Sequence, residues 1–475
     1  MKTGRLSRGR APWAPWVVLG AGVSFVGFAT PGAGQEHAAR RGAANPLGAV
    51  VAEALGNNLG LRQERLLEEA AEARMREARG RYLPALTVDS RYTEQSGAVD
   101  IGDFVNPAYG ALNQLTGTSQ FPTNVSVTLP LRHESRLRLV QPVFNERIRA
   151  GWSAAGHAYE SQRALRLASA RALAADAQTA FLEVAAARSA LRIWEATFLL
   201  VQESERVAER LLAAGTATPD AVFRARAERS DVQQRLDEAA EAERAASRAF
   251  NHVVGRAQDA PVDPVDESSL AFDLALTEEQ AVERALAHRE ELVALGSGVE
   301  SLRAGVRAAT AGFLPEVSVA LDYGFQGREL SFGRDHDFWA ASLVVSWSLF
   351  NGGQDQARRH AALADADRLG LRRDDTEQLI RLETRQAYQA AVVARGGIET
   401  AEDRLAAAER SFELVRRRYE EGLASPVEFL DARTALTNAE LNRVVTVYRY
   451  AVRWVDLERA AALLDISTLE NASWN

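Results

Sequence analysis

The sequence predicts a mainly α-helical protein with a β-barrel portion, built on an internal tandem duplication. Three observations predict this fold: motifs recur in the same order in both halves, each half has a Leu-Pro step followed by strand-like alternation, and each half has a helical stretch of about 70 residues without proline. At 1.5 Å per residue such a helix is about 100 Å long, more than a compact soluble domain needs.

The duplication is visible in three motif pairs, of which the first is offset by 231 residues and the last by 207. Because the pairs keep their order, we interpret them as a tandem repeat with a longer insert in the first half. The pairs are Tyr-Leu-Pro at 82–84 with Phe-Leu-Pro at 313–315, Pro-Val-Phe-Asn at 142–145 with Ser-Leu-Phe-Asn at 348–351, and Gly-Thr-Ala-Thr-Pro at 215–219 with Gly-Leu-Ala-Ser-Pro at 422–426.

Each half opens with a predicted helix, at 46–80 and 277–311, that ends at the Leu-Pro step. Proline removes a backbone donor and disfavours helical geometry in the residue before it, so an extended segment should follow. Period-two alternation then predicts one hairpin per half. The expected strands are 85–93, 135–144, 314–327 and 337–349, and the expected outward loops are 94–123 and 328–336.

The long predicted helices cover 146–213 and 353–420, and a shorter helix follows each one, at 219–255 and 425–464. Each long helix has the combined length of two shorter ones, so it should pack beside a stacked pair. Apolar residues at alternating spacings of three and four support coiled-coil packing. They are Ile398, Ala401, Leu405, Ala408, Phe412, Val415 and Tyr419, with Leu191, Trp194, Phe198 and Val201 in the first half.

Four strands cannot close a barrel, and open strand edges cannot face lipid. Three copies would supply twelve strands, an even number within the range of outer-membrane barrels. The expected architecture is therefore a trimeric twelve-stranded β-barrel continued by a long helical coiled-coil barrel.

The N-terminus has a basic segment, an apolar run and small residues, an order typical of a secretory signal at 1–34. The alternative is a retained membrane anchor, because the apolar run approaches spanning length. We divide the remainder into the repeats 46–255 and 277–464, a linker at 256–276 and a tail at 465–475.

Composition argues against catalysis and against nucleic acid. The chain has a net charge of −8 and no cysteine, and Lys2 is its only lysine, so a phosphate loop and a thiolate metal site are both excluded. The seven histidines are scattered without metal-ligand spacing. We expect no enzyme activity, no cofactor and no metal, and an acidic chain without basic clusters is a poor nucleic-acid binder.

The ordered set of motifs resembles the TolC family of outer-membrane efflux proteins over about residues 46–464. The resemblance implies a homotrimeric channel in the outer membrane of a Gram-negative bacterium that extends into the periplasm. Such a channel passively conducts substrates delivered by an inner-membrane pump of RND, ABC or MFS type and a periplasmic adaptor, in a tripartite efflux pump or type I secretion system. The alternative is a periplasmic coiled-coil adaptor or structural protein.

The two glycine-containing turns would lie at the periplasmic tip, where the resemblance implies adaptor docking. Glycine tolerates the left-handed conformation that ends helices, while Thr218 and Ser425 are placed as N-caps, with a capping box from Ser425 to Glu428. The docking residues are Gly215, Thr216, Ala217, Gly422, Leu423, Ala424 and Ser425.

Glu428 and Asp431 lie three residues apart, hence on one helix face. The resemblance implies that they ring and constrict the entrance, although capping alone also explains Glu428. Tyr419 matches one member of the family's closing latch. The positions of its other two members are Ala424 and Ala221, so the latch is incomplete, and neighbouring Asp220 and Arg224 are candidates to replace it.

Overall fold

The computed structural model describes residues 46–94, 96, 99–129, 132–264, 272–327, 332–333 and 335–466. The predicted signal segment 1–34 and most of the predicted tail lie outside this range. The elements in chain order are α2 (Pro46–Asn57), α3 (Leu59–Gly80), β1 (Ala85–Tyr92), β2 (Val99–Asp100), α4 (Gly102–Thr116), β3 (Thr128–Leu129), β4 (His133–Phe144), α5 (Glu146–Ala213), α6 (Pro219–Val254), α7 (Glu278–His288), α8 (Glu290–Thr310), the short 3-10 helix η3 (Ala311–Phe313), β5 (Glu316–Gly327), β6 (Asp337–Ser346), α9 (Gln354–Glu420) and α10 (Pro426–Ala460).

The two long helices occur where proline-free sequence predicts them. Helix α5 has 68 residues and α9 has 67. The Asn145 side chain begins α5 by accepting a hydrogen bond from the amide of Ile148 at 3.1 Å, which satisfies one of the free donors of the first turn. Gly353 precedes α9 at a φ of 81°, a conformation that glycine adopts without steric cost.

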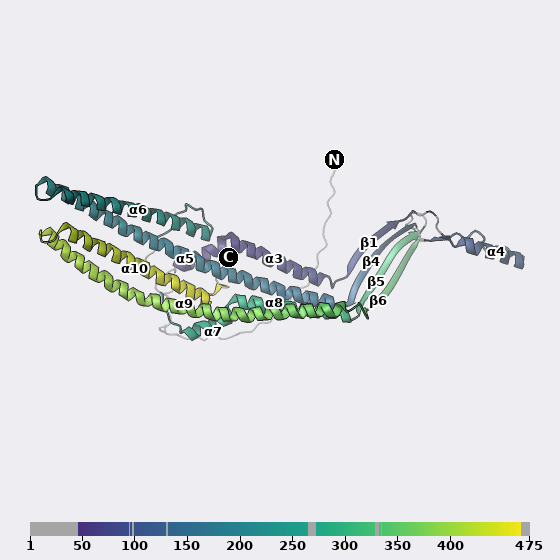
Figure 1. Ribbon diagram of the computed structural model, residues 1–475. Coiled ribbons are helices and arrows are strands. Elements are labelled where there is room, and N and C mark those ends of the chain that lie inside the picture. The colour runs from purple at the N-terminus through teal and green to yellow at the C-terminus, as the bar shows by residue number, and fades with distance from the viewer. Residues whose placement is uncertain are drawn as a thin grey trace, which may run out of the picture. The chain divides into compact units, whose positions relative to one another are not determined.

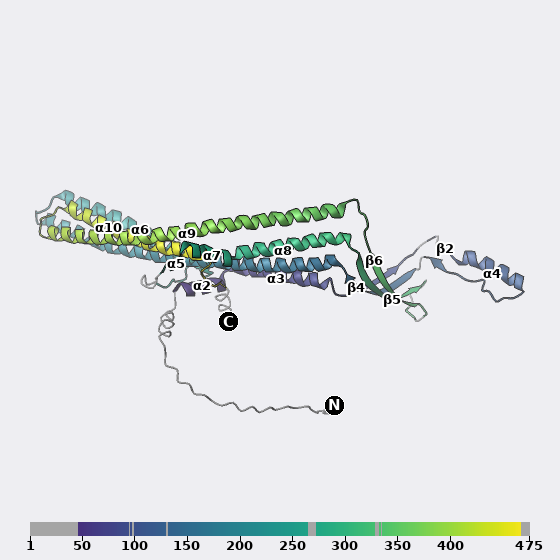
Figure 2. The same cartoon turned by 90° about the horizontal axis from the view of Figure 1, so that it is seen from below.

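Shorter helices lie end to end beside the long ones, as predicted. Both α3 and α6 pack on α5, and both α8 and α10 pack on α9 (Figures 1 and 2). The Asn58 amide at the start of α3 donates to the carbonyl of Val253 at the end of α6 over 2.9 Å. In the second half, the Arg289 guanidinium before α8 donates to the carbonyl of Ala460 at the end of α10 over 3.3 Å.

The opening helix of each half is broken, and the prediction of continuous helices at 46–80 and 277–311 is wrong. Asn58 is extended and its side chain accepts from the amide of Leu61, so a new helix begins there. Arg289 is also extended, with a ψ of 122°, and separates α7 from α8. In both places a side-chain contact to a distant helix end accompanies the interruption, so tertiary packing outweighs local helix propensity.

The four main strands form one antiparallel sheet in the order β1-β4-β5-β6. Pairing of β4 with β5 joins the two hairpins and aligns Leu137 with Tyr323. Within the described residues β1 and β6 each have a neighbour on one side alone. The sheet follows directly on the helices, because α5 begins two residues after β4 ends.

A helix lies in the segment predicted as the loop 94–123. Helix α4 has 15 residues and ends at Gly117, which has a φ of 63°. The short strands β2 and β3 pair before and after it. The loop prediction rested on polar and glycine residues; Gly102 and Gly117 do lie at the helix ends, but Asn106, Gly110 and Asn113 lie within the helix.

The largest apolar core lies where α2, α5, α6 and α10 meet. Phe181 and Phe250 lie 5.4 Å apart between ring centroids, and Tyr448 packs against the same cluster. The predicted apolar stripes of the long helices are buried or half-buried throughout, with Phe412 and Val201 among the most enclosed. No helix in the described part of the chain has both the length and the apolar composition needed to cross a membrane.

Candidate functional site at the helical tip and the sheet

Both turns at the helical tip have the predicted geometry. Gly215 has a φ of 73° and Gly422 a φ of 76°. The amide of Leu423 donates back to the carbonyl of Arg418 at 2.7 Å, and the amide of Thr216 donates to that of Leu211 at 3.0 Å. These bonds satisfy carbonyls left free at the ends of α9 and α5. A Cβ atom at either glycine would meet open space, so only the backbone conformation requires glycine there.

The capping box of α10 is confirmed. The Ser425 hydroxyl accepts from the amide of Glu428 at 3.2 Å, and the Glu428 carboxylate accepts from the amide of Ser425 at 2.7 Å. The backbone bond, aided by the Ser425 hydroxyl, holds the pKa of Glu428 below its ordinary value. Thr218 occupies the N-cap position of α6, but its side chain makes no capping bond to that helix. Its hydroxyl instead bonds the Asp220 carboxylate and lowers the pKa of that group.

Tyr419 lies in a small cavity between the two tip turns. Its ring stacks on Phe429, with centroids 4.8 Å apart and planes inclined by 22°. The cavity has a volume of about 190 Å³ and is also lined by Asp220, Ala221 and Arg224. Asp220 and Arg224 therefore lie near Tyr419, as predicted, but they form an ion pair with each other at 3.6 Å.

The other tip residues are presented to solvent. Gly215, Thr216, Gly422, Leu423 and Ser425 are exposed, while Ala217 and Ala424 are half-buried. Glu428 and Asp431 are exposed on the first turns of α10. The structure brings Glu428 against Ser425 and leaves both carboxylates open to the surroundings of the tip.

Sequence reasoning missed an exposed aromatic side chain beside the tip. Phe223, in the first turns of α6, is 66% exposed, as is Leu423. Together with Val427 these side chains add apolar surface beside the two turns. One signal was available in the sequence. Phe223 lies outside the spacing of three and seven that joins Val222, Ala225 and Val232, which are buried on α6.

A buried ion pair joins the two helical hairpins near the tip. Arg433 on α10 is 3% exposed and binds the carboxylate of Glu228 on α6. Burial lowers the pKa of Arg433 against the opposing influence of Glu228. Close by, the hydroxyls of Thr197 and Thr437 hydrogen bond across α5 and α10 at 3.2 Å. The hairpins are thus held together by polar contacts that no local motif reveals.

A second buried network surrounds the α7–α8 break. Arg289 binds Glu291 through two nitrogens, at 2.8 and 2.9 Å, and reaches Glu383 on α9 at 3.1 Å. Burial alone would lower the pKa of Arg289, but its interactions with Glu291 and Glu383 have the larger effect and raise that pKa. Arg171 on α5 binds Glu290 in the same bidentate manner at 2.7 and 2.9 Å. Opposite charges compensate each other here, so the α7–α8 junction is fixed against the middle of α5 and of α9 without a buried unpaired charge.

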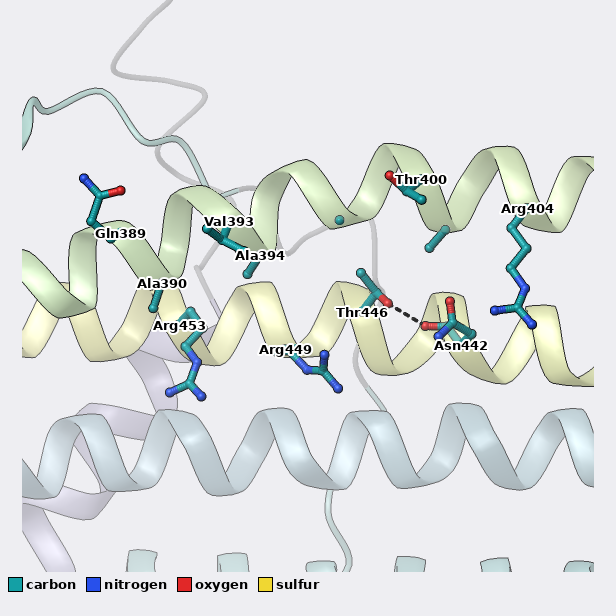
Figure 3. A pocket seen from close by; sticks show the side chains of 12 residues that line it. Gln389, Ala390, Val393, Ala394, Thr400, Arg404, Asn442, Thr446, Arg449 and Arg453 are labelled. Carbon is teal, nitrogen blue, oxygen red and sulfur yellow. Dashed lines mark hydrogen bonds between the residues drawn. The ribbon is translucent and has the colours of Figure 1, made fainter.

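A groove with basic side chains runs between α9 and α10 (Figure 3). Its volume is about 660 Å³, and Arg404, Arg449 and Arg453 contribute to its walls. None of the described residues that line it is acidic. Arg453 also pairs with Asp456 on its own helix at 3.0 Å.

The groove and the described end of the linker that follows α6 occupy different sides of α10. Tyr450, one residue after Arg449, donates to the carbonyl of Phe272 in that linker at 3.1 Å. Successive helical residues point about 100° apart. Arg449 therefore points to a different side of α10 from the one that contacts Phe272.

The four-stranded sheet has two chemically different faces. Val88, Leu137, Tyr323 and Trp339 are aligned across β1, β4, β5 and β6, and all four are exposed. The next row has the opposite orientation, because side chains alternate along a strand.

That second face contains charged pairs. Arg138 on β4 binds Asp322 on β5 at 2.7 and 3.1 Å. Arg136 lies 3.6 Å from Asp89 on β1. One face of the sheet is thus apolar and solvent-accessible in the single chain, while the other is charged and internally paired.

Comparisons with known proteins agree with this architecture. Residues 281–463 match the family model described as outer membrane efflux protein. The chain is 25% identical over 424 residues to the outer membrane protein OprJ of Pseudomonas aeruginosa, covering 86% of this chain and 82% of that protein.

Solved structures show the same fold at lower identity. The Campylobacter jejuni CmeC outer membrane channel matches with a TM-score of 0.72 at 17% identity, covering 90% of this chain and 89% of that chain. The open state of the Neisseria gonorrhoeae MtrE outer membrane channel matches with a TM-score of 0.70 at 18% identity, over 87% and 88% of the two chains. Through the family model over residues 281–463 and the similarity to OprJ over 86% of its length, the chain is homologous to outer membrane efflux proteins.

Proposed function

We propose that three copies of this chain form the outer-membrane exit duct of an efflux pump, with the helical tip as its periplasmic entrance. The observation that carries the proposal is the pair of unlike sheet faces. An apolar outward face and a polar interior are what a membrane-spanning barrel requires. The aligned row of Val88, Leu137, Tyr323 and Trp339 would face lipid, and the Arg138–Asp322 pair would face the interior.

The unpaired edges of β1 and β6 support closure by further copies. Backbone groups at a strand edge cannot remain unsatisfied in lipid. Joining β6 of one copy to β1 of the next would satisfy both edges, and three copies would close a twelve-stranded barrel. The helical columns of the three copies would then continue as a wall around the same axis.

The duplication of the chain is part of this proposal, and contacts between helix ends support it. Asn58 and Arg289 interrupt the opening helices and are 231 residues apart, the offset of the first motif pair. Their acceptors, Val253 and Ala460, are 207 residues apart, the offset of the last pair. The residues that the proposed repeat would make equivalent thus make similar contacts in the two halves.

The partners we propose are a periplasmic adaptor and an inner-membrane pump. The exposed turns at Gly215 and Gly422 would receive the adaptor, because Phe223, Leu423 and Val427 offer apolar surface around them. Glu428 and Asp431 would line the entrance, where threefold symmetry would gather six carboxylates. The alternative of a periplasmic adaptor or structural coiled coil gains no support from the family match.

Labelling of single cysteines tests this topology, because the native chain has none. Ser119→Cys, in the β1–β4 connection, should react with a membrane-impermeant maleimide on intact cells. Ser230→Cys, exposed on α6, should react only after the outer membrane is permeabilised. The reverse pattern, or equal labelling of both variants on intact cells, would contradict the proposed orientation.

A further inference from the structure

Helix α4, in the connection from β1 to β4, has one face that is fully engaged. The Asn106 side chain donates to the carbonyl of Val125 at 2.7 Å and accepts from its amide at 2.8 Å. Asn113 makes the same reciprocal pair with Phe121, at 2.7 and 3.0 Å. Tyr109, between the two asparagines, packs on Phe121 with centroids 5.7 Å apart. This face binds the returning segment and is unavailable to a partner.

The opposite face carries an apolar stripe with no cover in the described chain. Phe104, Ala108, Ala111 and Leu115 recur at spacings of four, three and four, the pattern of a coiled-coil seam. Phe104 is 74% exposed and Leu115 is 84% exposed. At 100° per residue the stripe lies nearly opposite the two asparagines.

The base of the helix holds this stripe in a defined position. Asp100 accepts from the amides of Gly102 and Val127, each at 2.8 Å, and also binds the Ser126 hydroxyl. A Cβ atom at Gly102 would lie 1.9 Å from the carbonyl oxygen of Val125. The start of α4 and the segment that returns toward β3 therefore meet where only glycine fits. The start of α4 and the returning segment are therefore held together at the base of the helix that carries the exposed stripe.

We propose that the stripe of Phe104, Ala108, Ala111 and Leu115 binds the same stripe on α4 of a second copy of this chain. The inference rests on the proposed assembly of copies through β1 and β6, which would bring successive α4 helices out of the same rim. Charge favours this partner over a lipid surface. Helix α4 has no basic residue, whereas helices that lie on anionic membranes are rich in Lys and Arg.

The test uses two single-cysteine variants of the full chain in outer membranes. Leu115→Cys places a thiol in the stripe, and Gln114→Cys places one on the adjoining exposed side of the same turn. A short bis-maleimide should join Leu115→Cys chains into covalent dimers and leave Gln114→Cys chains single. Equal cross-linking of the two variants, or none in Leu115→Cys, would overturn the pairing of stripes.

The mass of the extracted assembly separates this inference from the proposed function. A trimer without cross-linking at Leu115→Cys refutes the α4 contact and leaves the duct intact, whereas a single chain refutes the assembly itself. Protection of Leu115→Cys from a monofunctional maleimide, without cross-linking, would show a different protein on the stripe and also overturn the proposal. As a second variant, Ala111→Glu should lower the temperature at which the trimer dissociates, while Gln114→Glu should leave it unchanged.

Discussion

The ion pair between Glu228 and Arg433 should hold the two helical hairpins together near the tip. Glu228→Gln removes the negative partner and leaves the guanidinium enclosed at 3% exposure, with its Nε atom already lacking a hydrogen-bond partner in the described structure. The variant should therefore favour separation of α6 from α10. Arg433 cannot gain water without such a movement.

The magnitude follows from burial. Removing one partner of a fully buried pair costs about 3–5 kcal/mol. Because the Glu228 side chain is 28% exposed and the Asp231 charge also acts on Arg433, we expect less, about 2–3 kcal/mol. That corresponds to roughly a 30- to 150-fold rise in the equilibrium constant for local opening.

Hydrogen exchange followed by mass spectrometry measures this opening directly. Amides of α6 and α10 around the pair should exchange faster in Glu228→Gln, while those near Phe181 should not change. Glu241→Gln is the control, because its carboxylate binds Arg244 and Arg248 on the open surface of α6. Replacing both members of the pair, as Glu228→Leu with Arg433→Met, should restore much of the protection. Unchanged exchange in Glu228→Gln would refute the role of the pair.

Four further predictions concern the tip and the groove. Gly422→Asp and Gly422→Ala should each reduce the stability of the positive-φ turn by about 1 kcal/mol. Only the charged variant should abolish transport while the protein remains in the membrane. Full transport by Gly422→Asp would show that the turn takes no part in docking. Neutralising Glu428 and Asp431 together should lower cation selectivity, measured as the reversal potential of single channels under a salt gradient, and an identical potential would leave only the capping role. Replacing Arg404 and Arg449 with alanine should shift that potential in the opposite direction, and no shift would place the groove outside the conducting path. The folded-state pKa of Glu428 is depressed, so its carboxylate should stabilise α10 above its ordinary pKa of about 4.3, and this stabilisation should be lost as pH falls through the folded value. Amide hydrogen exchange at the start of α10 should therefore be the same in Glu428→Gln and the wild type only in acid.

Features coded by short stretches of sequence could be predicted. The bounds of α5 and α9 follow from the absence of proline, and the left-handed turns follow from Gly215 and Gly422. The capping box at Ser425 is likewise local, since its two members are three residues apart. In each case the partners that decide the conformation are neighbours in the chain.

Features that depend on distant partners could not be predicted. Arg433 and Glu228 are 205 residues apart, and Arg171 and Glu290 are 119 residues apart, so no spacing rule links them. The break at Arg289 likewise has no local signal, although Asn58 is a recognisable N-cap residue. Helix α4 was missed because its glycines and asparagines were taken as loop formers, whereas two of the asparagines bind the returning segment.

The number of chains in the assembly tests the central claim most directly. The protein extracted from outer membranes in mild detergent should be weighed intact by native mass spectrometry. Three chains per particle are predicted, because three four-stranded sheets satisfy the edges of β1 and β6 by closing a twelve-stranded barrel. A particle of one or two chains would contradict the account, since eight strands or fewer from these sheets could not enclose a duct continuous with the helical columns.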